Sequence, residues 1–258
     1  MLIKEIVKWC IPHGIYNMYL NLKRHNYLFR ITTHRGILEF TDYDKNLTNT
    51  IGDDWKESSY YEFAENNLNT WWDENSIFHK YFIQLDCKNI VELACGHGRH
   101  VQKYIEMAEM VTLVDINQEN IDFCKKRYIN ETKIKYLVND GSNFKGIDSN
   151  SQTAIFTYDA MVHFEMLDII EYLKDANRIL VDGGKILFHH SNAAFSPELF
   201  YTHKPHGRNY LSADIFAYMA LRCGFKILSQ DIMSWGEGSN LTENIDCLSF
   251  CQKVKNIY

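Results

Sequence analysis

A buried strand that runs into a glycine turn is the feature that most constrains the fold of this chain. The segment from Val91 to Arg99 reads Val-Glu-Leu-Ala-Cys-Gly-His-Gly-Arg and follows Ile90. Gly96 and Gly98 let the backbone turn sharply and approach a ligand closely, because they have no Cβ. The helix that follows would point free N–H groups and its positive dipole end at that ligand. The pattern predicts a site for the polar part of a nucleotide-like cofactor.

A second apolar run ends in a carboxylate. The residues from Val111 to Val114 precede Asp115, which lies nineteen positions after Gly96. That spacing leaves room for one helix, over about residues 99–109, and a second parallel strand. Open α/β sheets bind ligands at the carboxyl edge, so Asp115 is placed to accept both hydroxyls of a ribose. The same geometry would serve NAD, and Asp115 alone does not decide the cofactor.

Strands and helices alternate along the rest of the chain. The pattern predicts strands over residues 134–138, 154–158, 185–189, about 226–232 and about 244–253, with helices over about 165–180 and 213–222. The segment Asp182-Gly183-Gly184 is interpreted as a turn, and Gly224 as a helix cap. This alternation indicates βαβ units and a mostly parallel, seven-stranded α/β sheet. Residues 85–258 would form this domain, and the aromatic-rich residues 1–84 a helical cap or lid.

The details of the turn distinguish between cofactors. A dinucleotide fingerprint has glycine or alanine three residues after its second glycine, where this chain has Val101. Glu92 lies inside the strand, an unusual place for a carboxylate without a task. The arrangement Glu-x-Ala-Cys-Gly-x-Gly resembles motif I of the class I S-adenosylmethionine (SAM) methyltransferases. The resemblance covers about residues 85–255 and implies a Rossmann-like fold, with SAM as cofactor and S-adenosylhomocysteine (SAH) as product.

The resemblance also implies cofactor contacts in this chain. Glu92 would help to position the turn and the methionine end of SAM. Asp140 would accept from the adenine amino group, with the two residues after it against the ring. In the cap, Tyr60 and Tyr61 are candidates for an aromatic ring over the sulfonium, because a cation is attracted to a π face. The expected cofactor residues are Glu92, Ala94, Gly96, Gly98, Arg99, Asp115, Ile116, Asp140, Gly141, Ser142, Tyr158, Tyr60 and Tyr61.

Candidate catalytic residues follow the fourth and fifth strands. Methyl transfer depends mainly on alignment and exclusion of water, and it needs a general base when the acceptor is a hydroxyl. His163 is the preferred base, because imidazole titrates near neutrality. Asp159, closer to the strand end, would orient that base or contact the cofactor. Of the pair His189 and His190 on the fifth strand, His190 is expected to face the cleft.

The acceptor site is predicted from a polar loop and from short resemblances. Residues 191–211 include His203, Lys204, His206 and Arg208, which would suit an anionic acceptor if the loop covers the carboxyl edge. A solvated surface loop is the alternative. The segments Ala-Cys-Gly-His-Gly-Arg, Tyr-Asp-Ala-Met-Val-His-Phe and His-His-Ser-Asn resemble small-molecule methyltransferases of bacterial surface-polysaccharide (capsule) gene clusters. Some of these methylate sugars and others capsular phosphoramidate, which implies O-methylation of a small polar acceptor.

Composition narrows the partners and the compartment. The net charge is −6 and no Lys/Arg block stands out, so the basic footprint of a nucleic-acid-binding protein is missing. The seven cysteines include no Cys-x-x-Cys pair and are interpreted as reduced core residues of a cytoplasmic protein without a metal site. No integral membrane segment is expected, and the chain would be a monomer or a homodimer.

Two other functions stay open at the level of sequence. One is an NAD-dependent oxidoreductase on a similar sheet, against which Val101 and Glu92 argue. The other is a catalytically inactive partner subunit that keeps the SAM fold.

Overall fold

The structure, a computed structural model, describes residues 47–56, 58–194, 206–236 and 238–255. The chain divides between Leu47 and Thr48, and Thr48–Tyr258 forms one compact unit. Before the sheet, residues 48–54 of this unit are helical, and α4 (Tyr60–Asn66), α5 (Leu68–Trp71) and α6 (Ile77–Phe82) follow. The compact unit therefore includes residues 48–84, the later part of the segment 1–84 that was expected to form a cap or lid.

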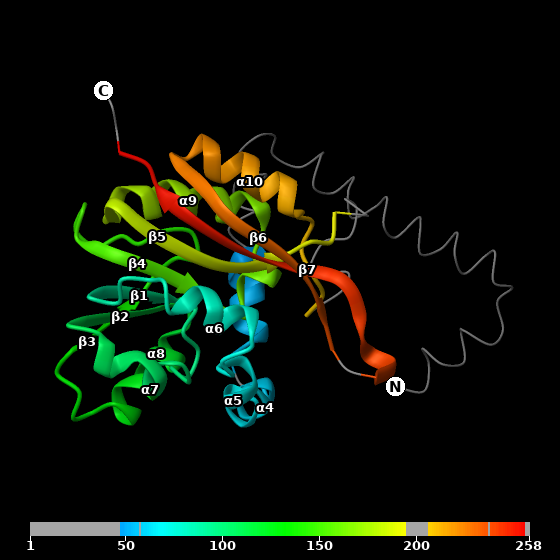
Figure 1. Ribbon diagram of the computed structural model, residues 1–258. Coiled ribbons are helices and arrows are strands. Elements are labelled where there is room, and N and C mark those ends of the chain that lie inside the picture. The colour runs from blue at the N-terminus through cyan, green and yellow to red at the C-terminus, as the bar shows by residue number, and fades with distance from the viewer. Residues whose placement is uncertain (1–46, 57, 195–205, 237, 256–258) are drawn as a thin grey trace, which may run out of the picture. The chain divides into compact units, whose positions relative to one another are not determined.

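A seven-stranded sheet forms the centre of the unit, as the alternation predicts (Figure 1). The strands are β1 (Asn89–Leu93), β2 (Met110–Asp115), β3 (Ile134–Val138), β4 (Gln152–Thr157), β5 (Leu180–Ser191), β6 (Phe225–Trp235) and β7 (Thr242–Lys253). Their order across the sheet is β3-β2-β1-β4-β5-β7-β6. The first five are parallel, and β7 runs antiparallel to both of its neighbours.

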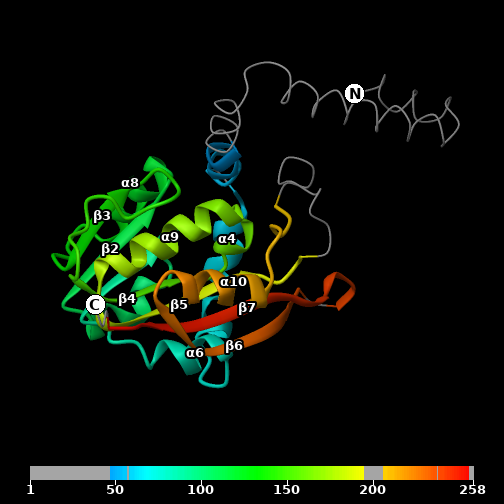
Figure 2. The same cartoon turned by 90° about the horizontal axis from the view of Figure 1, so that it is seen from above.

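Helices cover both faces of the sheet. The α-helices that follow β1 are α7 (Val101–Tyr104), α8 (Gln118–Arg127), α9 (Met166–Ile179) and α10 (Ala213–Arg222). Short 3-10 helices cover Ile105–Met107, Met161–His163 and Gly238–Asn240. Helices α9 and α10 lie on one face, while α6, α7 and α8 pack on the other (Figures 1 and 2). Each face has its own buried hydrophobic cluster, so the sheet lies between two cores.

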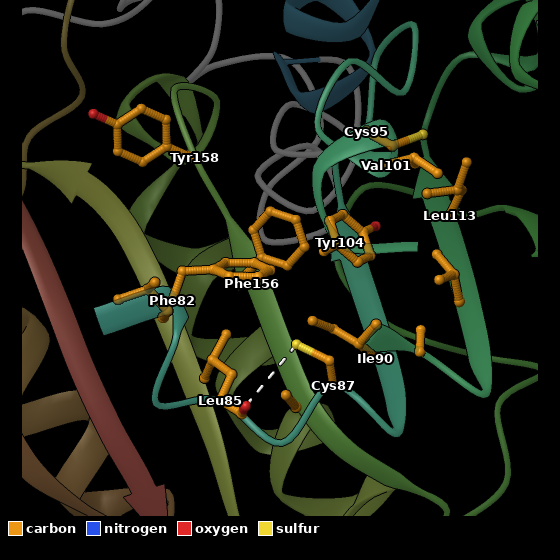
Figure 3. Packing of buried hydrophobic residues seen from close by; sticks show 14 of the residues in the cluster. Phe82, Leu85, Cys87, Ile90, Cys95, Val101, Tyr104, Leu113, Phe156 and Tyr158 are labelled. Atoms are coloured by element: carbon orange, nitrogen blue, oxygen red, sulfur yellow. Dashed lines mark hydrogen bonds between the residues drawn. The ribbon is translucent and has the colours of Figure 1, made fainter. Parts of the chain in front are cut away.

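Helix α6 is part of the core beneath the sheet. The Phe82 ring is fully buried and meets the Phe156 ring edge-on at 5.1 Å and the Tyr104 ring at 5.5 Å (Figure 3). The Ser76 hydroxyl caps the helix by accepting from the His79 N–H at 3.0 Å. Aromatic residues before β1 thus serve to build the same core as β1 and β4.

Two local expectations differ from the structure. The helix expected over residues 99–109 is only α7 followed by a 3-10 turn. Asp182-Gly183-Gly184 does not interrupt the fifth strand but lies inside β5, where pairing with β4 skips from Leu180 to Lys185. Gly183 takes a φ of +80° at this irregularity. In agreement with the sequence, Gly224 ends α10 with a φ of +85°.

Among the residues that the structure describes, no helix is both long and apolar enough to cross a membrane.

Candidate functional site

A cavity opens at the carboxyl ends of β1, β2 and β4. Its volume is about 840 Å³, measured out to its mouth. In the strand order, β1 lies between β2 and β4, which makes this edge the switch point where open α/β sheets bind ligands. The lining residues are Thr48, Ile51, Gly52, Trp55, Tyr60, Tyr61, Leu93, Ala94, Gly96, Arg99, Asp115, Ile116, Asn117, Asn120, Asn139, Gly141, Tyr158, Asp159, Ala160, His163, Phe164, Asp168 and Tyr172.

The two glycines of the turn have different tasks. Gly96 lines the cavity with a φ of +53°, and a Cβ there would lie 2.7 Å from Cε1 of Tyr61. Gly98, with a φ of +69°, does not line the cavity. A Cβ at Gly98 would lie 3.1 Å from both Cys124 Sγ and Tyr128 Cε2. Gly96 therefore lets the chain pass under the Tyr61 ring, whereas Gly98 lets the turn pack against α8 and the residue that follows it.

Asp115 joins the end of β2 to the glycine turn. Its carboxylate accepts from the backbone N–H groups of Gly96 and Asn117, each at 2.9 Å, and from the Asn120 amide at 3.1 Å. The side chain is almost fully buried, and burial raises its pKa, while these donors favour the ionised form. The structure thus places Asp115 in the cavity, where the sequence predicted it.

Asn120 connects Asp115 to the helices before the sheet. Its amide nitrogen donates to the Tyr61 hydroxyl at 2.9 Å as well as to Asp115. The amide oxygen is buried and accepts no hydrogen bond from the protein. Sequence reasoning missed this residue, although Asn120 lies in the first turn of the helix after Asp115, where a polar side chain can reach back to the strand end.

Glu92 lies in β1, before the glycine turn. Its carboxylate accepts from the Tyr104 hydroxyl at 2.7 Å, and it does not line the cavity. Burial raises the pKa of Glu92 to about 7, with the bond from Tyr104 opposing that rise. The Glu92 side chain joins β1 to α7, and its expected task of helping to position the turn and the methionine end of a cofactor stays a prediction.

A buried polar cluster surrounds Asp159. Its carboxylate accepts from the Tyr60 hydroxyl at 2.6 Å and lies 3.3 Å from Nη2 of Arg99. Asp159 has a φ of +64°, a left-handed conformation that costs a non-glycine residue energy. Burial raises the pKa of Asp159, and Arg99 and Tyr60 oppose that rise. The Arg99 Nε is buried without a partner, which leaves a donor beside the cavity.

His163 lines the cavity and has a defined tautomer. Its Nδ1 lies 2.8 Å from the carbonyl oxygen of Gly207, so Nδ1 carries the hydrogen and Nε2 keeps the lone pair. The ring centroid lies 4.9 Å from that of Trp55. Burial lowers the pKa of His163 to about 4. The imidazole is therefore neutral at pH 7, although its basicity is much weaker than that of an exposed histidine.

His190 does not face the cleft, which corrects the expectation for the fifth strand. The ring is fully buried and stacks on Phe216, with centroids 4.1 Å apart. Its Nδ1 lies 2.8 Å from the Ser191 carbonyl and its Nε2 lies 2.8 Å from the Ser249 hydroxyl. Both nitrogens are occupied within the core, so His190 has no atom left for an acceptor. The neighbouring His189 is also buried and does not line the cavity; its Nδ1 accepts from the backbone N–H of Asp159 at 3.0 Å.

The loop after β3 also differs from expectation. Asp140 is exposed, and its Oδ1 accepts from the backbone N–H of Ser142 at 3.1 Å, the side-chain bond of a turn. Neither Asp140 nor Ser142 lines the cavity, whereas Asn139 and Gly141 on either side of Asp140 do. Gly141 has a φ of +86°, which brings it close to Thr48 and Ile116. Asn139 is one of the polar residues at this end of the cavity.

The helices before the sheet contribute more of the cavity than predicted. Both tyrosines expected there, Tyr60 and Tyr61, line it together with Trp55. The Asn117 amide donates to the Gly52 carbonyl at 2.8 Å, which ties these helices to the end of β2. Thr48, Ile51, Gly52, Trp55, Asn117, Asn120, Asn139, Phe164, Asp168 and Tyr172 are lining residues that the sequence did not indicate. Contacts such as that of Asn117 with Gly52 join residues far apart in the chain, and no spacing in the sequence indicates them.

The polar loop is described only in part, and His203 and Lys204 lie outside the described residues. The Arg208 side chain, which is described, does not line the cavity. Its guanidinium donates from Nε and Nη2 to the two carboxylate oxygens of Asp246, both at 2.6 Å. Arg208 therefore gives no support to an anionic acceptor.

No metal-binding group emerges from the described part of the chain, where no cluster of three or more His, Cys, Asp or Glu could hold an ion. The six cysteines described there are free thiols, most of them buried.

Comparison with known proteins identifies the fold. Residues 90–184 match the family of methyltransferase domains. YqeM of Bacillus subtilis (strain 168), which is named as a methyltransferase, is 27% identical over 100 residues, or 38% of this chain and 40% of YqeM. The chain thus spans less than half of that relative in the match.

Solved structures extend the likeness over the sheet. A SAM-dependent methyltransferase from Mesorhizobium loti has a TM-score of 0.56 and 14% identity, covering 68% of this chain and 97% of that one. A chain of the Haloferax volcanii complex between the Trm112 methyltransferase activator and a methyltransferase has a TM-score of 0.60 and 13% identity, covering 79% and 97%. The expected fold is confirmed: the unit has the Rossmann-like class I methyltransferase architecture.

Proposed function

We propose that this protein is a SAM-dependent methyltransferase that moves a methyl group to oxygen of a small polar acceptor. The observation that carries the proposal is the cavity at the carboxyl edge, where the glycine turn, Asp115 and Arg99 meet. The match of residues 90–184 to methyltransferase domains supports it.

The donors and acceptors of the cavity suit SAM. Two buried polar atoms on its walls lack a partner within the protein: the Arg99 Nε, a donor, and the Asn120 Oδ1, an acceptor. An unpaired buried polar atom costs free energy, so a bound group that pairs with both is favoured. A carboxylate suits the Arg99 guanidinium, and ribose hydroxyls suit Asn120 together with Asp115. SAM carries both groups.

The walls would align the reactants and exclude water. When bound, SAM supplies an activated methyl group on a sulfonium. The cavity is lined with apolar and aromatic surface from Trp55, Tyr60 and Tyr158. Such walls would hold SAM and the acceptor in line and exclude water. The Tyr60 hydroxyl is held by Asp159 at 2.6 Å, so the ring has one orientation. A ring fixed in this way can attract a cation through its π face.

His163 would take the acceptor's proton on Nε2. The Gly207 carbonyl holds the hydrogen on Nδ1, which leaves the Nε2 lone pair for a hydroxyl group. Because the pKa of His163 is about 4, the free imidazole is present at every physiological pH. The low basicity of His163 limits its contribution as a general base. Asp159, whose pKa is raised by burial, is the second group proposed to take the acceptor's proton.

The acceptor class rests on sequence resemblance. The segments around residues 94–99, 158–164 and 189–192 resemble methyltransferases of surface-polysaccharide genes, which favours a sugar, nucleotide-sugar, phosphate or phosphoramidate acceptor. A cavity closed on one side by the helices of residues 48–66 admits a small molecule more readily than a polymer.

Calorimetry with SAM, SAH and NADH tests the cofactor. We expect saturable binding of SAM and SAH and none of NADH. Binding of NADH in place of SAH would overturn the proposal. Radiolabelled methyl transfer then tests the acceptor, with sugars, nucleotide-sugars and phosphorylated compounds compared with tRNA, DNA and protein. Strong methylation of bulk nucleic acid would contradict a small acceptor.

A further inference from the structure

A chain of buried polar residues connects the loop before α10 to the floor of the cavity. Arg208 makes a two-pronged ion pair with Asp246 on β7, whose side chain is fully buried. Oδ2 of Asp246, which accepts from Nη2 of Arg208, also lies 3.3 Å from Nε2 of His189 on β5. The His189 Nδ1 accepts the backbone N–H of Asp159 at 3.0 Å. The chain therefore runs from Arg208 to Asp159 through two strands.

His189 is placed to hold Asp159 in its unusual conformation. Because Nδ1 accepts a hydrogen bond, the hydrogen of neutral His189 is on Nε2, which faces Asp246. Asp159 has a φ of +64°, and such a conformation persists only where the surroundings hold it. The bond from the Asp159 N–H to a fully buried ring is one such restraint.

The same loop holds His163. The Gly207 carbonyl, one residue before Arg208, accepts from Nδ1 of His163 at 2.8 Å. One residue after Arg208, the backbone N–H of Asn209 donates to the Val162 carbonyl at 2.9 Å. Residues 207–209 are thus linked to both groups proposed to take the acceptor's proton. Gly207 contacts His163 directly, whereas Arg208 is linked to Asp159 through Asp246 and His189.

We propose that Arg208, Asp246 and His189 are positioning residues. They hold residues 207–209 in place beside the cavity and thereby fix the positions of His163 and Asp159 together. When Arg208 and Asp246 form their ion pair, the Gly207 carbonyl orients His163, and the His189 ring orients Asp159. The proposal rests on the proposed function only in the task that it gives to His163 and Asp159. The coupling itself is a property of the fold.

A charge-balanced double variant gives the test. Removing Arg208 alone would leave Asp246 buried and unpaired, which can unfold a protein for reasons unrelated to positioning. Arg208→Gln combined with Asp246→Asn removes both charges and keeps polar groups of similar size. The matched control is Arg178→Gln with Asp175→Asn, an ion pair of 2.5 Å on α9.

Nuclear magnetic resonance of histidine-labelled protein supplies a readout that needs no acceptor. The groups facing His163 are the Gly207 carbonyl and Trp55, with Arg208, His206 and Asp246 acting through their charge. In the native protein we expect a slowly exchanging Nδ1–H and a pKa of about 4. In the double variant the loop releases the ring, the Nδ1–H exchanges with water, and the pKa rises by about one unit or more towards the ordinary value of about 6.5.

The control pair should leave the His163 titration unchanged. An unchanged titration and a protected Nδ1–H in the folded double variant would overturn the proposal. If the double variant does not fold, Asp246→Asn alone keeps the shape of the cluster, and the same changes are expected at smaller size; their absence there would also overturn it. Failure of native protein to bind SAH would contradict the proposed function without touching this result.

Discussion

At the scale of single residues, Asp115 has two duties. It binds the N–H of Gly96 and so shapes the turn, and it is the proposed partner of a ribose. We predict that Asp115→Ala lowers SAH affinity at least tenfold, because one or more hydrogen bonds to a charged acceptor are lost; tenfold corresponds to about 1.4 kcal/mol. Calorimetry measures the change.

The control for this prediction is Asp122→Ala on the exposed side of α8, which should bind SAH as the native protein does. If folded Asp115→Ala bound SAH with the affinity of the native protein, Asp115 would not be a ribose-binding residue.

His190 makes stability depend on pH. Burial lowers its pKa to about 3, so the unfolded chain takes up a proton at a pH where the folded protein does not. Stability is therefore complete above the unfolded pKa of about 6.5 and falls as the pH drops towards 3. Between pH 7 and pH 5 this residue should remove about 2 kcal/mol. In His190→Gln that part of the loss should vanish, as urea unfolding at both pH values would show; an equal loss in both proteins would contradict it.

The sequence predicts strand ends better than it predicts which side chain reaches the cavity. Asp115 lies at the end of β2 as predicted, because an apolar run followed by a carboxylate indicates where a buried strand ends. His190 is wrong because neighbouring residues of a strand point to opposite faces and the sequence does not show what covers each face; the His190 ring stacks on Phe216, and His189 does not line the cavity either. At residues 139–141 the Asp140 side chain accepts from the Ser142 N–H, a turn that an Asp-Gly pair favours, and the sequence alone did not decide between this turn and a bond to the cofactor.

At the scale of elements, the turn from β1 to α7 depends on packing at Gly98. We predict that Gly98→Ala costs about 1–3 kcal/mol more than Gly238→Ala. Both glycines have a positive φ, +69° and +55°, so both substitutions carry the backbone strain. Only at Gly98 would the new Cβ meet neighbours, at 3.1 Å, whereas nothing lies within 4 Å at Gly238. Urea unfolding of the two variants gives the difference, and equal costs would show that the crowding is relieved without penalty.

Most elements could be predicted because local signals agree with the fold. Apolar runs mark β1 to β4, and the face containing Ile169, Leu173 and Ala176 marks α9. The continuation of β5 through Gly183 could not be predicted, because it depends on partners that are distant in the chain, including the Gln252 amide that donates to the Gly183 carbonyl at 2.8 Å. The place of α6 in the core was missed for a similar reason. Aromatic residues indicate that a helix is buried, but they do not indicate which elements it packs against.

At the scale of the whole molecule, the sheet depends on its last strand. β7 lies between β5 and β6, and at its end the buried Lys253 ammonium donates to the Leu180 carbonyl at 2.8 Å. We predict that a chain ending at residue 236, without β7, is insoluble, because β5 gains an unpaired edge and β6 loses its partner. A chain ending at residue 255 is the control and should stay soluble. Soluble, cooperatively folding protein from the shorter chain would contradict the prediction; sedimentation and circular dichroism of both decide.

The strand order also gives translation a role in the folding of this protein. β6 leaves the ribosome before β7, yet it can join the sheet only through β7. Synthesis of the residues from Trp235 to Lys253 takes about one to four seconds at about 5–20 residues per second. During that interval the nascent chain presents the bare edge of β5 to other nascent chains and to chaperones. Codons that slow this final stretch would lengthen the exposure and lower the yield of folded protein, although the amino-acid sequence stays the same.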